Sequence, residues 1–254
     1  MNSMMKAVVA AALIILISGC STQLSNKAAI TSAIANESRT DEHRERDARS
    51  KPAEILAMFD LRQGDDVIDL MGGGGYYAEL MLGVVGNEGS VILHNNTPYS
   101  RFVEKQLEER YGDNQFPGIT VIKSEVDALG LAENSLDAAL MVMCYHDLYY
   151  HNPERGWHNT DVGLFFSQVR GALKPGGKLL VIDHAAAAGT GRESAQTVHR
   201  IDEEFARAEI QSYGFEYVDS SDALRNPDDD YSKMVFDKTV RGKTDRFALL
   251  FRKD

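Results

Sequence analysis

Short apolar runs alternate along the chain with stretches whose apolar residues recur at helical spacing. Five of the runs read as strands, at residues 67–69, 90–93, 119–123, 138–144 and 178–182. The fourth is apolar throughout, which is typical of a strand covered on both faces of a sheet. Helical spacing is clearest over 98–111 and 161–173. This alternation predicts an α/β fold with a doubly wound, mostly parallel sheet.

Two further strands and a long helix are expected near the C-terminus. Residues 193–213 show one helical stripe, and the strands follow at 215–218 and 246–251 with an irregular stretch between them. The stripe of the helix predicts four buried side chains, Val198, Ile201, Phe205 and Ala208. Ahead of the first strand, Ser50 is expected to cap a helix over 53–59.

The stretch VIDLMGGGGYYAEL, residues 67–80, reads as a strand, a tight glycine turn and the start of a helix. Glycine allows positive φ angles and lets the backbone approach a ligand closely. The amides at the start of the helix then face that ligand. A dinucleotide pattern G-x-G-x-x-G fails here, because its third glycine falls on Tyr77 or Ala78. A turn that holds no ligand is the alternative interpretation.

The same stretch resembles motif I of class I S-adenosylmethionine (SAM) methyltransferases, in which an acid precedes three alternating glycines. Asp69, Gly73 and Gly75 fit the motif, Gly72 lies within it, and Met71 replaces the first glycine. The segment LKPGGKLLVID also resembles a turn of this superfamily that leads into its fifth strand. The resemblance implies a seven-stranded sheet in the order 3-2-1-4-5-7-6, an antiparallel seventh strand and SAM as cofactor.

Six segments resemble a small bacterial family of predicted methyltransferases, many of them exported. They are DARSKPAEIL, GGGGYYAEL, YHDLYY, LLVIDHAA, VHRIDEE and GKTDRFALLFRK. The resemblance covers nearly all of residues 45–254.

Two cofactor contacts follow from the superfamily resemblance. In this superfamily an acid at the end of the second strand accepts hydrogen bonds from the ribose hydroxyls. Here Asn95 or Asn96 takes that position. An amide accepts one hydroxyl and donates to the other, without the strength of a charged acceptor. Asp127 matches the residue that contacts the adenine amino group.

Polar residues follow the fourth and fifth strands, where sites form in doubly wound sheets. His146 and Asp147 end the fourth strand, and Asp183 and His184 end the fifth. A histidine suits general-base catalysis because its ordinary pKa is near neutrality. His199, off the buried stripe of the long helix, is a further catalytic candidate. The alternative for His146 is a residue that caps the next segment, and residues 151–157 are a candidate lid.

The N-terminus has the pattern of a bacterial lipoprotein signal peptide. Lys6 precedes an apolar run over 7–17, which is too short to span a bilayer, and the run ends in Ile17-Ser18-Gly19-Cys20. Residues 1–19 are therefore expected to be removed and Cys20 to carry lipid. Residues 20–49 form a tether and a charged helix, and 50–254 the methyltransferase-like domain. Ser21 indicates the outer membrane of the cell envelope, facing the periplasm.

An ordinary signal anchor with an incidental cysteine is the alternative to this lipid anchor. Apart from Cys20 the chain has one cysteine, Cys144, so the mature protein has no internal disulfide. The net charge of −11 makes nucleic acid an unfavourable partner. The lipid rather than charge is expected to hold the protein at the membrane.

These patterns predict a SAM-dependent methyltransferase with a small-molecule acceptor. SAM is made in the cytosol, whereas the N-terminus indicates export. The alternative is therefore an exported, non-methylating lipoprotein that uses the same fold to bind another ligand or a metal. His146, Asp183, His184 and His199 are the candidates for such a metal site, although their spacing is not diagnostic. The acceptor and the oligomeric state do not follow from the sequence.

Overall fold

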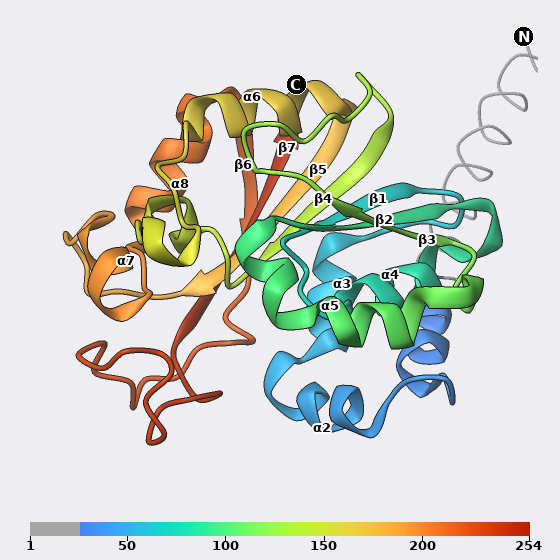
Figure 1. Ribbon diagram of the computed structural model, residues 1–254, viewed down its shortest axis with the longest axis horizontal. Coiled ribbons are helices and arrows are strands. Elements are labelled where there is room, and N and C mark those ends of the chain that lie inside the picture. Colours follow the sequence, from blue (N-terminus) through green and yellow to red (C-terminus); the bar gives the residue numbers. More distant parts are fainter. Residues whose placement is uncertain (1–25) are drawn as a thin grey trace, which may run out of the picture.

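A computed structural model describes residues 26–254, and its centre is a seven-stranded sheet. The strand order is β3-β2-β1-β4-β5-β7-β6, as expected (Figure 1). The strands are β1 (Asp66–Leu70), β2 (Ser90–Asn95), β3 (Ile119–Lys123), β4 (Leu136–Val142), β5 (Leu173–His184), β6 (Phe215–Ser220) and β7 (Arg246–Lys253). The predicted signal peptide and Cys20 lie outside the described residues.

The direction of β7 decides which residues meet at the functional edge of the sheet. Strands β1 to β5 pair in parallel, whereas β7 is antiparallel to both β5 and β6. The start of β7 therefore lies beside the end of β5, with His184 opposite Arg246. Residues just before β7 thereby reach the edge where the parallel strands end.

Alternating side chains of the central strands point into two hydrophobic cores. On β1, Val67 packs with α3 and α4, whereas Ile68 and Leu70 pack with α6 and α8. Figure 1 shows these two groups of helices on opposite faces of the sheet. One face carries α3 (Pro52–Phe59), α4 (Tyr76–Val85) and α5 (Thr97–Tyr111), and the other carries α6 (Val162–Ala172) and α8 (Glu203–Ser212).

A further α-helix precedes α3, and the remaining helical elements after it have six residues or fewer. They are α2 (Asp41–Ser50), α7 (Glu193–Val198), η1 (Gly86–Glu88), η2 (Gly112–Asn114), η3 (His146–Tyr149) and η4 (Pro153–Arg155). None of the helices within residues 26–254 is long and apolar enough to cross a membrane.

Residues 26–35 are helical and belong to the core, which differs from the expected tether. Ile30 and Ala33 are buried in the cluster that contains α3 and α4. A side chain at Gly83 would meet the Cβ of Ala33 at 2.6 Å, so the two helices pack closely. The apolar face of this segment is thus covered by the domain rather than exposed on a free linker.

The expected helix cap at Ser50 is wrong. Ser50 is the last residue of α2, and Lys51 makes the turn to α3 in a left-handed conformation with φ 47°. The Ser50 hydroxyl accepts a hydrogen bond from Arg46 Nε at 3.3 Å instead of capping α3. Pro52 begins α3, where its missing N–H costs no hydrogen bond.

The single helix expected over 193–213 is also wrong, because it breaks between α7 and α8. His199 ends α7 with φ 54°, and Ile201 forms a bridge with Ala185 beside the sheet. Asp202 then caps α8 and accepts the N–H of Glu204 at 2.9 Å. A buried side chain at the break and a new cap therefore override the helical spacing. Ile201 is buried as expected, whereas Ala208 is exposed.

A buried ion pair anchors the irregular segment before β7. Arg200 is fully buried and donates to both carboxylate oxygens of Asp229, at 2.8 and 3.0 Å. Asp229 also accepts the N–H of Asp245 at 2.6 Å. Because a buried charge is stable only when paired, this contact holds residues 219–245 against the break between α7 and α8.

Candidate functional site

The glycine turn after β1 is built from left-handed residues. Met71, Gly73 and Gly75 have φ angles of 51°, 59° and 87°. Met71 thus adopts the conformation that glycine favours, at the position where motif I has its first glycine. A side chain at Gly73 would meet no atom within 4 Å, so the peptide at this position is open to a ligand.

Asn95 holds this turn in place. Its Oδ1 accepts the N–H of Gly73, and its Nδ2 donates to the carbonyl of Gly73, both at 2.9 Å. The neighbouring Asn96 caps α5 by accepting the N–H of Tyr99 at 3.0 Å. Both candidates for the ribose position therefore already hydrogen-bond to the backbone.

His94 supports the turn from the same strand. It is fully buried, and its Nδ1 lies 3.3 Å from the N–H of Met71 while its Nε2 lies 2.9 Å from the carbonyl of Ser124. Burial lowers the pKa of His94, which keeps the imidazole neutral and able to accept the Met71 N–H.

Asp69, the acid of the motif, lies beneath the turn. It is 2% exposed, and its Oδ2 makes no hydrogen bond with any other described side chain or backbone group. Burial raises the pKa of Asp69 to about 7, although Arg46 and the Ala78 N–H act in the opposite direction. Gly72 is required above it, because a Cβ there would lie 2.4 Å from Asp69 Cγ. Asp69 is thus a buried acceptor at the edge of a cavity.

A cavity of about 1030 Å³ opens above the ends of β1, β4 and β5. It is lined by glycine-loop residues, by the candidate catalytic residues and by several aromatic side chains. These include Asp69, Gly72, Gly73, Tyr99, Phe102, His146, Asp147, Tyr150, Trp157, His184, His199 and Phe236. Gly75 is not among the lining residues, because Tyr111 and Leu93 occupy the space beside it.

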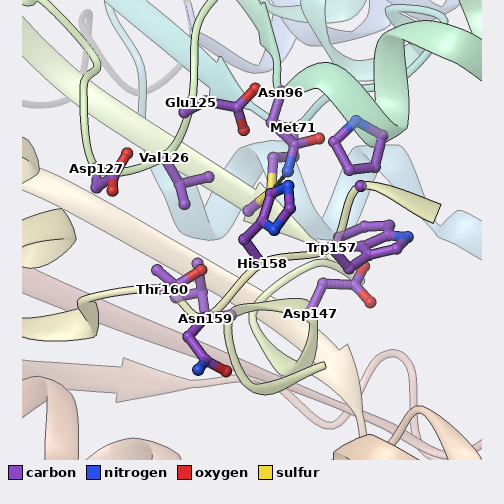
Figure 2. Close-up of a pocket in the computed structure, with 13 residues that line it drawn as sticks. Met71, Asn96, Glu125, Val126, Asp127, Asp147, Trp157, His158, Asn159 and Thr160 are labelled. Atoms are coloured by element: carbon purple, nitrogen blue, oxygen red, sulfur yellow. Dashed lines mark hydrogen bonds between the residues drawn. The ribbon is translucent and has the colours of Figure 1, made fainter. Parts of the chain in front are cut away.

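A smaller cavity of about 140 Å³ adjoins the first and shares Met71, Asp147 and Trp157 with it. Asp127 lines this cavity and is exposed. Figure 2 shows Val126 and Asp127 on one side of this cavity and Trp157 and Asp147 on the other. Of the candidate lid, residues 151–157, Gly156 and Trp157 line this cavity, and the next three residues, 158–160, line it as well.

His146 lies between two carboxylates. Its Nδ1 is 2.8 Å from Asp183 Oδ1, and its Nε2 is 3.3 Å from Asp147 Oδ1. Burial alone would lower the pKa of His146, but Asp147 and Asp183 outweigh that effect and raise it to about 9. In this protonation state His146 is a cation and a poor general base at neutral pH.

His199 and His184 lie beside His146 and Asp147 but differ in their contacts. His199 Nδ1 lies 3.4 Å from Asp147 Oδ1, and its ring centroid lies 4.5 Å from that of Tyr150, with the two rings tilted by 39°. His184 Nδ1 lies 2.7 Å from the Thr244 hydroxyl, and burial lowers its pKa well below the ordinary value, with His146 adding to the effect. Asp147 therefore faces two imidazoles, whereas His184 is neutral and faces the segment before β7.

Sequence reasoning missed Tyr99 as a member of this cluster. Its hydroxyl donates to Asp147 Oδ2 at 2.8 Å from the first turn of α5. The helical pattern assigned it only to an amphipathic helix, and nothing in the sequence spacing relates it to Asp147, 48 positions away.

The rim of the larger cavity is basic although the chain is acidic. Six cationic side chains line it, against the two carboxylates Asp69 and Asp147: Arg46, Arg49, Arg155, Lys238, Arg241 and Arg246. Arg46 lies over the Tyr76 ring at 4.2 Å. Arg246 is buried and donates to the Arg49 carbonyl, and its Nε makes no hydrogen bond with any described residue. Arg46 and Arg49 both belong to α2, which thus contributes two of these cations.

Comparison with known proteins agrees with this architecture. A family described as "Methyltransferase domain" matches residues 68–181, from β1 to β5. The ubiquinone/menaquinone biosynthesis C-methyltransferase UbiE of Hahella chejuensis is 27% identical over 125 residues, which is 48% of this chain and 44% of that protein. UbiE of Francisella tularensis subsp. holarctica is 26% identical over 130 residues, covering 51% and 47%. The chain thus spans less than half the length of these relatives.

Solved structures share the fold over most of the chain. A SAM-dependent methyltransferase from Aquifex aeolicus aligns over 85% of this chain and all of its own, with a TM-score of 0.57 and 18% identity. One from Mesorhizobium loti aligns over 82% of this chain and all of its own, with a TM-score of 0.56 and 16% identity. Residues 68–181 therefore match a methyltransferase domain, and the chain as a whole shares the fold of SAM-dependent methyltransferases.

The protonation of Asp69 gives a test of the site without substrate. The unfolded carboxyl has a pKa near 3.9, and the folded one about 7. Between these values the folded state binds the extra proton, so Asp69 makes stability fall as pH rises from about 4 to about 7. Asp69→Asn removes this loss. We expect the cofactor-free variant to gain up to about 4 kcal/mol over the wild type at pH 8 and little at pH 4.

Urea unfolding at a series of pH values measures this difference. Asp113→Asn is the control, because Asp113 is exposed and has a φ of 53° that asparagine tolerates. An Asp69→Asn variant that keeps the pH slope of the wild type would contradict the assignment of a buried, protonated acid.

Proposed function

We propose that this protein transfers a methyl group from SAM to a small-molecule acceptor within the larger cavity. The observation that supports this best is that the glycine turn with Asp69 and the histidine cluster open into the same cavity. Methyl transfer requires in-line approach of a nucleophile to the sulfonium methyl group, and a shared cavity brings both reactants together.

The cofactor is assigned to both cavities. Its adenosine would occupy the smaller cavity, with Asp127 near the adenine amino group. Its methionine portion would run over the open peptide of Gly73 toward Asp69 and Arg46. Asp69, as a buried acceptor with a free oxygen, suits the methionine ammonium group, and Arg46 suits the carboxylate. Asn95 contributes by fixing the turn rather than by a direct ribose contact.

The acceptor is assigned an aromatic or apolar body and an anionic group. Tyr99, Phe102, Tyr150 and Phe236 line the cavity, and cations outnumber carboxylates on its surface. Because the cavity lining carries more positive than negative side chains, it attracts an anion, which the rest of this protein of net charge −11 repels.

Proton removal from the acceptor is assigned to the cluster formed by His146, Asp147 and His199, with His184 beside it. His199 lines the cavity and is partly exposed, whereas His146 is 2% exposed and held by Asp183. His146 therefore acts by holding Asp147 ionised. Burial would raise the pKa of Asp147, but His146, Tyr99 and His199 lower it.

Calorimetric titration with SAM and with its demethylated product tests the cofactor site. Gly73→Val should abolish binding, because the side chain would fill the open space above the peptide. Gly64→Val is a matched control, since Gly64 also has a positive φ, 86°, with no atom within 4 Å, but lies outside both cavities. No binding to the wild type at millimolar SAM would favour the non-methylating alternative. Equal loss of SAM binding in both variants would show that backbone strain, rather than a blocked cofactor site, causes the effect.

The anionic character of the acceptor is testable with a matched pair of probes. We expect 4-hydroxybenzoate to bind more tightly than its methyl ester in ligand-observed NMR. The double variant Arg49→Gln/Arg241→Gln should weaken the acid roughly 5- to 10-fold and leave the ester unchanged, because two exposed cations contribute up to about 1 kcal/mol each. Lys105→Gln/Arg252→Gln changes the net charge equally outside the cavities. Equal binding of acid and ester would contradict the proposal.

The lipid anchor remains a proposal that rests on the sequence around Cys20. Cells grown with a palmitate analogue should label the wild type and not Cys20→Ser, because the cysteine is the residue that carries the lipid. Cys144→Ser serves as the control, since Cys144 is buried in the core. An unlabelled wild type would contradict the proposed anchor.

A further inference from the structure

Two imidazoles and one carboxylate converge at the ends of η3 and α7. His146, Asp147 and His199 each offer one ligand atom within 4.8 Å of the others, and the first two are buried. All three line the larger cavity. The sequence analysis named Asp183 and His184 as metal candidates beside His146 and His199. In the structure Asp147 takes their place.

Two of the distances within this cluster match the spacing of neighbouring metal ligands. Asp147 Oδ1 lies 3.3 Å from His146 Nε2 and 3.4 Å from His199 Nδ1. Hydrogen bonds from N–H to oxygen are usually about 2.7–3.2 Å long. In a tetrahedral zinc site with bonds of about 2.0–2.1 Å, neighbouring ligand atoms are roughly 3.3–3.4 Å apart. His199 Nδ1 is buried and makes no hydrogen bond with any described residue.

Asp183 and Tyr99 orient two side chains of the cluster, as residues that contact metal ligands do in metal sites. Asp183 contacts His146 Nδ1 at 2.8 Å, which directs the lone pair of Nε2 toward Asp147 and His199 once the histidine is neutral. Tyr99 donates to the second oxygen of Asp147 at 2.8 Å and leaves Oδ1 for the cluster. His146 and Asp147 are therefore held in position by Asp183 and Tyr99 before any ion binds.

His199 is held in a conformation that few side chains adopt. Its φ of 54° is left-handed, and the hydrogen bond from the Val235 N–H to the Val198 carbonyl braces this end of α7. Strained backbone is found where function requires a side chain to point in one direction. Here the break between α7 and α8 turns the ring toward Asp147.

We infer that His146, Asp147 and His199 bind a divalent transition-metal ion, Zn²⁺ in the first instance, with its open coordination position facing the larger cavity. Three protein ligands with one open position are the pattern of catalytic zinc sites. Metal binding does not depend on methyl transfer. A role for the ion in lowering the pKa of the acceptor's hydroxyl or thiol rests on the proposed function.

The stoichiometry and affinity of Zn²⁺ binding are measured on the chain of residues 1–254, after a chelator has removed any bound ions. Titration with Zn²⁺ against a chromophoric chelator should give about one equivalent for the wild type. His199→Asn keeps a residue that tolerates positive φ and should bind at least 10-fold more weakly. Asp183→Asn should lose roughly 10- to 100-fold in affinity, because the residue orients His146. His151→Asn is the control, since His151 is exposed and outside both cavities.

X-ray absorption at the zinc edge of the wild type gives a second readout that needs no variant. We expect a first shell of nitrogen and oxygen ligands with the scattering pattern of two imidazoles. Zn²⁺ affinity equal in the wild type and His199→Asn, or a spectrum without imidazole, would overturn the inference. The same wild-type sample titrated with SAM separates this result from the proposed function, because either site can fail while the other binds.

Discussion

The carboxylate of Asp183 fixes the ends of two neighbouring strands, and the candidate site depends on it. It is fully buried and accepts hydrogen bonds from the His146 backbone at 2.8 Å and from the His184 backbone at 2.7 Å, besides its contact with His146 Nδ1. A buried carboxylate requires such donors, so the end of β4 cannot shift relative to β5 without losing several of them. The orientation of His146, and with it the position of Asp147, follows from this one group.

The fold was predictable because its signals are local. Apolar runs of strand length, a glycine turn between strand and helix and the KPGG turn before β5 are each read within a few residues. The convergence of His146, Asp147 and His184 was also predictable, since the ends of adjacent parallel strands meet at one edge. His199 lies beside them as well, but it is placed there by the break between α7 and α8, which the sequence pattern did not indicate.

What sequence reasoning missed depends on contacts between distant residues. The break at His199 exists because Arg200 pairs with Asp229 and Ile201 joins the sheet edge beside Ala185. Helical spacing over 193–213 carries no sign of either contact. Asn95 illustrates the same limit, because its position after β2 suggested a ligand contact, whereas its amide hydrogen-bonds to Gly73.

The place of β7 has a consequence for how the protein is made. Strand β6 hydrogen-bonds to the sheet through β7 alone among the described strands, and β7 follows it in the chain. During synthesis β6 and residues 219–245 therefore emerge with no sheet edge to join, and one wall of the cavity closes only after β7 inserts beside β5. Until that step the growing chain exposes the edge of β5 and its apolar side chains. That order of events makes the last strand the step that protects the nascent protein from association with other chains.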